Sequence, residues 1–220
     1  MIDRTLLVTG FEPFGGETIN ASWEAASKLE GWCGDGFVAA ARQLPCVYGL
    51  CVAEFIRLFA LLRPAAILLT GQAARRSVVS VERIARNEAN AVAPDNHGVV
   101  LGKREPDERA QWLETSACVG RIAGAIRGVG VPARVSVNAG DYVCNHLYYE
   151  ALTSLAQFSS RTPAVFIHLP ATPAQLPGRR GGLNTDRAVR ALRAAAGPLM
   201  AMCAAKRMRE TDVNRAQTAA

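Results

Sequence analysis

Short apolar runs alternate along this chain with segments in which apolar residues recur every three or four positions. A short apolar run bounded by turn residues is typical of a buried strand, whereas the longer spacing is typical of an amphipathic helix. Strand, helix and strand in repeated succession predict a three-layer α/β/α sandwich with a mostly parallel, mixed sheet. Strands are expected at residues 5–10, 37–44, 65–71, 77–86, 133–140 and 164–168.

Capping residues set the expected helix boundaries. Asn20 is a suitable N-cap for a helix that Gly31 ends, and Pro64 ends the next one. A third helix is expected to begin at Thr115 or Ser116. The remaining helices are expected at residues 144–158 and 185–206. Because no linker or repeat interrupts the pattern, we predict one domain over residues 1–208, followed by a frayed tail at 209–220.

Composition narrows the class of protein. Half of the residues are hydrophobic, yet no run reaches the eighteen or so apolar residues of a membrane span. The first residues read as a strand and lack the pattern of a signal peptide, so a cytoplasmic location is expected. Six cysteines without paired spacing indicate free thiols in a reducing compartment. The three histidines show no zinc-ligand spacing, so no metal is expected.

The net charge of +6 raises the question of nucleic-acid binding. The arginines, however, are spread thinly along the chain, and no basic run is interleaved with aromatic residues. We therefore interpret the charge as a basic solvated surface and expect no nucleic-acid or membrane partner.

Functional groups in α/β sheets collect on the loops that leave the carboxyl ends of the strands. Four such loops are expected to meet at one edge of the sheet. Their sequences are GFEPFGG after the first strand, GQAARR after residues 65–71, NAGDYVCN after residues 133–140, and HLPATP after the last strand.

Cys144 and His168 are the candidate nucleophile and base. Cys144 follows a strand and a small-residue turn and opens a helix, where the helix N-terminus favours the reactive thiolate. His168 ends a strand, so its imidazole can take the thiol proton and later protonate a leaving amine. His146 points away from Cys144 around the helix axis, and His97 lies in a turn. The other cysteines fit core or turn positions.

A third group is needed to orient the imidazole. Glu82 is one candidate because it stands in an otherwise apolar strand. The competing interpretation is that Glu82 forms an ion pair with Arg83 or Arg86 on an exposed strand. Asp141, beside the small-residue turn, is the other candidate for the third group.

At these loops the chain resembles the pyroglutamyl peptidase I family of cysteine peptidases, also called pyrrolidone-carboxylate peptidases. The matching segments run in order over nearly the whole chain, and the cysteine motif is highly specific. They read LLVTGFEPFGG, LLTGQA, SVERIARN, PDN, VSVNAGDYVCN and FIHLP.

The resemblance implies a catalytic triad of Glu82, Cys144 and His168, which selects Glu82 over Asp141. It implies a phosphorylase/hydrolase-like fold, a homotetramer, and no metal or organic cofactor. The implied substrates are peptides with N-terminal pyroglutamate, which the enzyme hydrolyses through a thioester. The residues implied in substrate binding are Phe11, Phe14, Gln72, Tyr142 and Val143.

The chain departs from the family pattern in three places. Val92 stands where an arginine is usual, and Arg86 is a candidate replacement. Ala74 and Arg75 occupy two glycine positions, and Asn138 replaces a Ser or Thr. Two alternative functions stay open: a related cysteine amidase acting on another small acyl group, and a non-catalytic relative that binds peptides or lactams.

Overall fold

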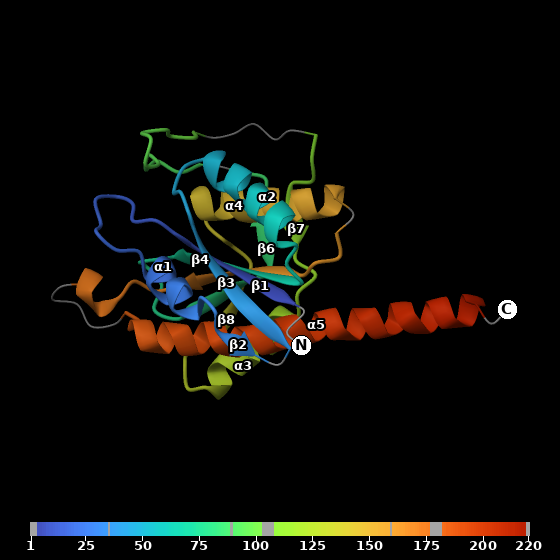
Figure 1. The fold of residues 1–220 in the computed structure, drawn as a ribbon. Helices are drawn as coiled ribbons and strands as arrows, with labels where there is room; N and C mark the ends of the chain where they lie inside the picture. The colour runs from blue at the N-terminus through green and yellow to red at the C-terminus, as the bar shows by residue number, and fades with distance from the viewer. Residues whose placement is uncertain are drawn as a thin grey trace.

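The computed structural model describes residues 4–34, 36–88, 90–102, 108–158, 160–176 and 182–218. Within them a seven-stranded sheet lies between two layers of helices (Figure 1). This is the three-layer α/β sandwich that the alternating pattern predicted. The strands of the sheet are β1 (Thr5–Phe11), β2 (Cys33–Gly34), β3 (Phe37–Leu44), β4 (Ala66–Gln72), β5 (Val79–Glu82), β8 (Ala133–Ser136) and β9 (Ala164–Leu169).

The strand order is β2-β3-β1-β4-β9-β5-β8. β1 pairs in parallel with β3 and β4, and β4 pairs in parallel with β9. β5 is antiparallel to β9, and β8 is parallel to β5, so β8 also runs opposite to β1, β4 and β9. The loop after β8 therefore leaves the sheet in the opposite direction from the other three, although residues of all four loops line one cavity.

The reversal of β5 follows from the short connection between β4 and β5, which is visible in the sequence. A parallel crossover needs a connection of about a dozen residues or more. Only residues 73–78 join β4 to β5, and no helix lies between them. Hydrophobic patterning carries no information about strand direction, so this connection length was the signal that the prediction overlooked.

Each face of the sheet has its own helices and its own core (Figure 1). One core cluster joins the sheet to two helices, and the other joins it to three. Both clusters are built from the apolar runs of the central strands, which are buried on both faces. The first face carries α2 (Leu50–Leu62) and α4 (Val143–Gln157); the second carries α1 (Ala21–Ala26), α3 (Val119–Gly128) and α5 (Thr185–Thr218).

Helix boundaries follow the capping predictions in part. Asn20 caps α1, its side chain accepting a hydrogen bond from the Ser22 amide at 2.9 Å. Thr115, in contrast, caps no helix; its hydroxyl donates to the Ala164 carbonyl, and α3 begins later, at Val119. α5 continues to Thr218, past the expected end at residue 206. The predicted division into one domain and a tail stays a prediction.

The segment predicted as one strand at residues 77–86 is two strands. β5 belongs to the main sheet, whereas β6 (Ile84–Arg86) pairs with β7 (Trp112–Glu114) in a separate two-stranded ribbon. Glu82 is consequently the last residue of β5, and it is completely buried.

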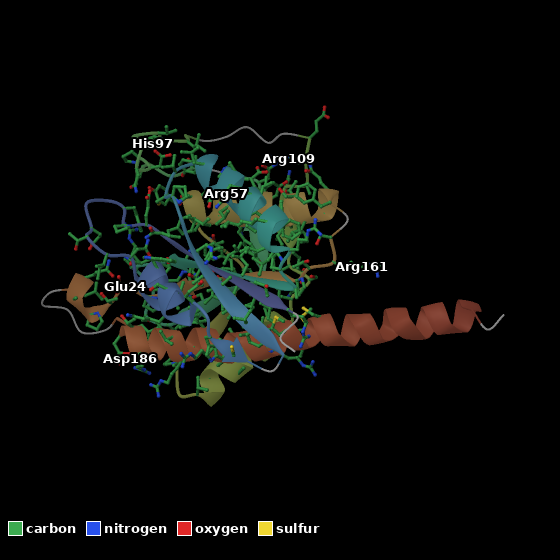
Figure 2. The ribbon with its side chains drawn as sticks, viewed as in Figure 1. Glu24, Arg57, His97, Arg109, Arg161 and Asp186 are labelled. Atoms are coloured by element: carbon green, nitrogen blue, oxygen red, sulfur yellow. The ribbon has the colours of Figure 1, made fainter. Side chains whose placement is uncertain are left out.

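The basic charge is dispersed over the molecule. Figure 2 shows labelled charged residues, among them Arg57 and Arg109, projecting from different parts of the periphery. Arg57 pairs with Glu54 at 2.7 Å, and Arg109 pairs with Glu150 at 2.9 Å. These local pairs fit the interpretation of a basic solvated surface. Among the described residues, no helix is long and apolar enough to cross a membrane.

Candidate active site

Cys144 lies in the first turn of α4, as the sequence predicted, and its sulfur rests against β4. A Cβ atom on Gly71 would lie only 2.8 Å from the Cys144 sulfur and 2.8 Å from the Phe166 ring. Position 71 therefore has to be glycine for the sulfur to reach the sheet at this point.

His168 lies beside the same glycine. In the register of β4 and β9, Gly71 is the direct partner of His168. Because Gly71 also packs against the Cys144 sulfur, Cys144 and His168 both lie at this glycine, and both line the same cavity. Nδ1 of His168 lies 2.9 Å from Oε1 of Glu82, which leaves Nε2 as the nitrogen available for proton transfer.

Glu82 is held by two side chains, that of His168 from β9 and that of Arg76 from the loop after β4. Besides His168, its Oε1 accepts a hydrogen bond from Nη1 of Arg76. The second amino group of Arg76 donates to the main-chain oxygen of Asn138 at 2.6 Å. Arg76 thus ties the carboxylate to the loop that leads into Cys144.

The competing assignments for the carboxylate do not fit the structure. Arg83 pairs with Glu114 at 2.7 Å, and Arg86 pairs with Glu88 at 3.4 Å. Glu82 is fully buried, so it is not an exposed strand residue with a local ion pair. Asp141 is exposed, and it is Glu82 that accepts the hydrogen bond from His168.

The protonation states follow from burial and from these partners. Burial raises the pKa of the Cys144 thiol well above its usual range; the charge of Glu82 adds to this and that of Arg76 opposes it. Burial also lowers the pKa of His168, although its bond to Glu82 acts in the opposite direction. For Glu82, burial would raise the pKa, but the interactions with His168 and Arg76 outweigh it and lower the pKa.

The resting site therefore holds a neutral thiol, a neutral imidazole and an ionised carboxylate. This corrects one expectation from the sequence, in which the helix N-terminus stabilises a standing thiolate at Cys144. The helix terminus is where it was predicted, but desolvation of the sulfur is the larger effect. The thiolate has to form as the proton moves to His168.

A cavity of about 370 Å³ opens over Cys144 and His168. Four of the five substrate-binding residues implied by the family resemblance line it, and Val143 does not, because its side chain is buried in the core. The lining residues are Phe11, Phe14, Asn20, Cys46, Gln72, Ala73, Ala74, Arg75, Arg76, Ala139, Gly140, Asp141, Tyr142, Cys144 and His168.

The aromatic wall of the cavity is fixed by its neighbours. The rings of Phe14 and Tyr142 lie 5.8 Å apart between centroids, and the Tyr142 hydroxyl donates to the Pro94 carbonyl at 2.9 Å. Oε1 of Gln72 accepts a hydrogen bond from the Ala21 amide at 2.7 Å. That bond leaves the amide nitrogen of Gln72 as its donor toward the cavity.

Sequence reasoning missed Arg76 as a member of the site. Its signal was present, because Arg76 stands in the GQAARR loop that leaves β4 beside His168. It also missed Cys46, which lines the cavity although its position beside a proline suggested an ordinary turn. Arg86, proposed as a replacement for the arginine absent at Val92, does not line the cavity.

The remaining histidines lie where the sequence placed them, whereas Cys118, expected at a core position within a helix, is the exposed N-cap of α3. The His146 ring accepts a hydrogen bond from the Gly49 amide at 3.3 Å, and His97 is exposed. All six cysteines are free thiols. Across the described ranges, no three His, Cys, Asp or Glu side chains are grouped to hold a metal ion.

A thiol at a helix N-terminus, an imidazole beside it and a buried carboxylate behind the imidazole form the constellation of a cysteine hydrolase. Comparison with known proteins agrees. The family model for pyroglutamyl peptidase matches residues 4–201. The chain therefore belongs to the pyroglutamyl peptidase family, a family of cysteine peptidases.

Individual relatives show the same likeness. A pyrrolidone-carboxylate peptidase from Escherichia fergusonii is 40% identical over 87% of this chain and 91% of its own length. One from Chromobacterium violaceum is 41% identical over 87% of this chain and 90% of its own. The crystal structure of Bacillus amyloliquefaciens pyroglutamyl peptidase I is 33% identical, with a TM-score of 0.87, and the match covers 90% of this chain and 98% of that one.

Proposed function

We propose that this chain is a cysteine exopeptidase that removes N-terminal pyroglutamate from peptides, with Cys144 as nucleophile, His168 as base and acid, and Glu82 as the group that orients His168. The observation that carries the proposal is the buried Glu82–His168 hydrogen bond beside a thiol that lines the same cavity. Membership of the pyroglutamyl peptidase family supports the choice of substrate.

The first step forms the acyl-enzyme. Nε2 of His168 accepts the Cys144 proton as the sulfur attacks the pyroglutamyl carbonyl carbon, and a tetrahedral oxyanion results. The protonated imidazole then donates that proton to the leaving amine, and the carbon–nitrogen bond breaks to give a thioester. Glu82, ionised and buried, stabilises the imidazolium that exists between the two transfers.

The second step releases the product. The neutral His168 accepts a proton from a water molecule, which attacks the thioester carbon. Collapse of the second tetrahedral intermediate expels the Cys144 sulfur, which regains its proton from His168, and free pyroglutamate leaves the cavity.

The start of α4 supplies donors for the oxyanion. The N-cap residue, Tyr142, makes no side-chain capping bond, and the first intrahelical bond runs from His146 to the Tyr142 carbonyl. The amides of Val143 and Cys144 therefore have no acceptor within the helix. Uncapped amides at a helix N-terminus are suited to stabilise a developing negative charge.

The cavity suits a neutral lactam. Pyroglutamate has an apolar ring face, a ring N–H and a ring carbonyl, but no free α-amine. Phe11, Phe14 and Tyr142 supply the apolar wall, and the amide nitrogen of Gln72 can donate to the ring carbonyl.

Two further properties are part of the proposal. A cytoplasmic location is supported by the six free cysteines. Assembly as a homotetramer is supported by the family resemblance, and valines such as Val135 and Val137 expose apolar surface at the edge of the sheet, 40% and 52% exposed. Light scattering on the purified protein measures the assembly state directly.

Hydrolysis of pyroglutamyl-aminomethylcoumarin tests the reaction. The wild-type protein is expected to cleave it, to leave the prolyl and alanyl analogues intact, and to lose the activity in Cys144→Ala without a change in folding. Cleavage of another acyl amide in preference to pyroglutamyl would favour the related amidase. Activity retained by Cys144→Ala would exclude the assigned nucleophile.

A further inference from the structure

Arg75 lies on a pinned turn at the mouth of the catalytic cavity. The turn follows β4: the Ala73 amide donates to the Leu169 carbonyl at 2.8 Å, and the Arg76 amide donates to the Ala73 carbonyl at 2.9 Å. Because Leu169 directly follows His168, these bonds hold the turn next to the catalytic base. Arg75 and Arg76 both line the cavity.

The two arginines differ in what they bind. Arg76 is mostly covered and is committed to Glu82 and to the Asn138 carbonyl. Arg75 is exposed, and within the described chain no residue forms a hydrogen bond or ion pair with its side chain. Asp141 also lines the cavity, yet it forms no ion pair with Arg75. The guanidinium of Arg75 is therefore available to a ligand.

The proposed reaction places the leaving group near this guanidinium. Phe11, Phe14 and Tyr142 hold the pyroglutamyl ring, and His168 protonates the nitrogen of the residue that follows it. That residue consequently emerges past His168, where the turn carrying Arg75 is pinned to β9.

We infer that Arg75 determines specificity by binding a carboxylate on the residue that follows pyroglutamate. Two kinds of substrate carry such a group: a pyroglutamyl dipeptide, through its free α-carboxylate, and a longer peptide with Asp or Glu at the second position. A guanidinium is well suited to either, because it donates two parallel hydrogen bonds to a carboxylate. This inference rests on the proposed function and adds to it a preference for the residue that follows pyroglutamate.

Paired substrates measure the effect. Pyroglutamyl-alanine is compared with its neutral C-terminal amide, and pyroglutamyl-glutamate amide with pyroglutamyl-glutamine amide. Because Arg75 is exposed, we expect a moderate effect: at low ionic strength the wild-type kcat/KM is about three- to tenfold higher for the charged member of each pair. Because the contact faces solvent, 0.5 M salt is expected to bring this ratio close to one, on the order of a twofold difference or less.

Variants separate Arg75 from the general charge of the protein. Arg75→Gln is expected to abolish the charged-to-neutral ratio, whereas Arg75→Lys keeps part of it. Arg121→Gln is the matched control, because Arg121 is an exposed arginine on α3, against the other face of the sheet, and this variant is expected to keep the wild-type ratio.

Each outcome bears on the inference. If the charged substrate is preferred in the first pair alone, the ligand of Arg75 is the α-carboxylate. If it is preferred in the second pair alone, the ligand is the side-chain carboxylate. Equal wild-type rates within both pairs, or a ratio that survives in Arg75→Gln, would overturn the role of Arg75 and leave the peptidase activity standing. If neither charged nor neutral pyroglutamyl peptides are cleaved, the proposed function fails as well.

Discussion

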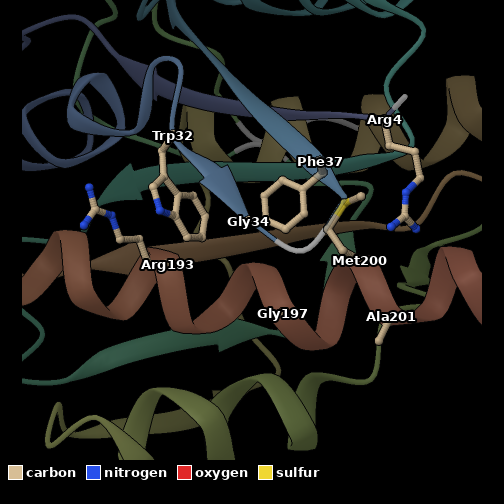
Figure 3. Close-up of a pocket in the computed structure, with 8 residues that line it drawn as sticks. All are labelled: Arg4, Trp32, Gly34, Phe37, Arg193, Gly197, Met200 and Ala201. Carbon is tan, nitrogen blue, oxygen red and sulfur yellow. The ribbon is translucent and has the colours of Figure 1, made fainter. Parts of the chain in front are cut away.

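Two hollows in this molecule look alike in size but differ in chemistry. The catalytic cavity has a volume of about 370 Å³. A second hollow, of about 500 Å³, lies between the β2–β3 hairpin and α5 (Figure 3). It is lined by Arg4, Trp32, Gly34, Phe37, Arg193, Gly197, Met200 and Ala201.

The polar groups of the second hollow are occupied by structural contacts. The Arg193 guanidinium lies 5.4 Å from the centre of the Trp32 ring, and Trp32 meets Phe37 edge to face at 5.4 Å. Nε of Arg4 donates to the Gly36 carbonyl at 3.1 Å. None of its eight lining residues is an acid, a histidine or a cysteine.

At the catalytic cavity, in contrast, Cys144 and His168 line the wall, Glu82 is buried behind His168, and the pKa of each of these three groups is shifted. Volume and aromatic walls are common to both hollows, so neither identifies a site of reaction. What distinguishes the catalytic one is a thiol, an imidazole and a buried carboxylate from three elements that are distant in sequence.

The sharpest test of this contrast removes the buried charge. Glu82→Gln keeps the size of the side chain but removes the carboxylate that orients His168 and stabilises its cation. We expect kcat/KM to fall about 10²- to 10⁴-fold. The pKa of His168 is already lowered, and without the carboxylate it falls further, so the acid limb of the pH profile moves to lower pH. An unchanged acid limb would mean that Glu82 does not act through His168.

A second test uses the protonation state of Cys144. Because burial raises the pKa of this thiol, the thiolate fraction rises about tenfold per pH unit across the neutral range. Alkylation of Cys144 by iodoacetamide, followed by peptide mass spectrometry, is expected to accelerate about 100-fold between pH 7 and pH 9. A fast rate that is constant from pH 6 to 8 would instead indicate a standing thiolate–imidazolium pair.

A third test disturbs the contact between β4 and the nucleophile. In Gly71→Ala the new methyl group would meet the Cys144 sulfur and the Phe166 ring, each at 2.8 Å. Displacement of the sulfur is expected to reduce kcat/KM about 10- to 100-fold and to cost roughly 1–3 kcal/mol of stability. Gly120→Ala on α3 is the control, since a Cβ there meets nothing within 4 Å. Equal activity in the two variants would contradict the packing argument.

The smallest effect on activity is expected from a substitution in the second hollow, between the β2–β3 hairpin and α5. Trp32→Ala removes the contacts with Phe37 and Arg193, so chemical denaturation should show a loss of about 1–3 kcal/mol. The value of kcat/KM is expected to stay within about twofold of wild type, because such a change is local. A tenfold fall would show that this hollow takes part in the reaction and would end the distinction between the two.

Much of the molecule could be predicted from residue patterns alone. Buried runs such as those of β3 and β4 were placed within a residue or two, because their composition and flanking turns are strong local signals. Cys144 and His168 stood out because each joins a reactive side chain to the end of a strand or the start of a helix.

The remainder depends on contacts between distant segments. The short connection at residues 73–78 already requires β5 to reverse, but the placement of Glu82 against His168 depends on β5 lying beside β9, which the order of the whole sheet decides. The raised pKa of Cys144 likewise comes from packing around the sulfur, which no spacing in the sequence reports. Arg76 was overlooked although Glu82 stands only 6 residues away, because its other partner, Asn138, lies 62 residues further along the chain.

The bond from Arg76 to Asn138 has a consequence for how this chain tolerates mutational drift. Arg76 holds a main-chain oxygen, which every amino acid presents, so the side chain at position 138 can change without loss of that bond. The side-chain oxygen of Asn138 accepts a hydrogen bond from the Gly140 N–H at 2.8 Å, and a hydroxyl at position 138 can accept the same bond. A substitution at position 138 therefore keeps this hydrogen bond, whereas a substitution of Arg76 removes it, although both positions take part in the same bond.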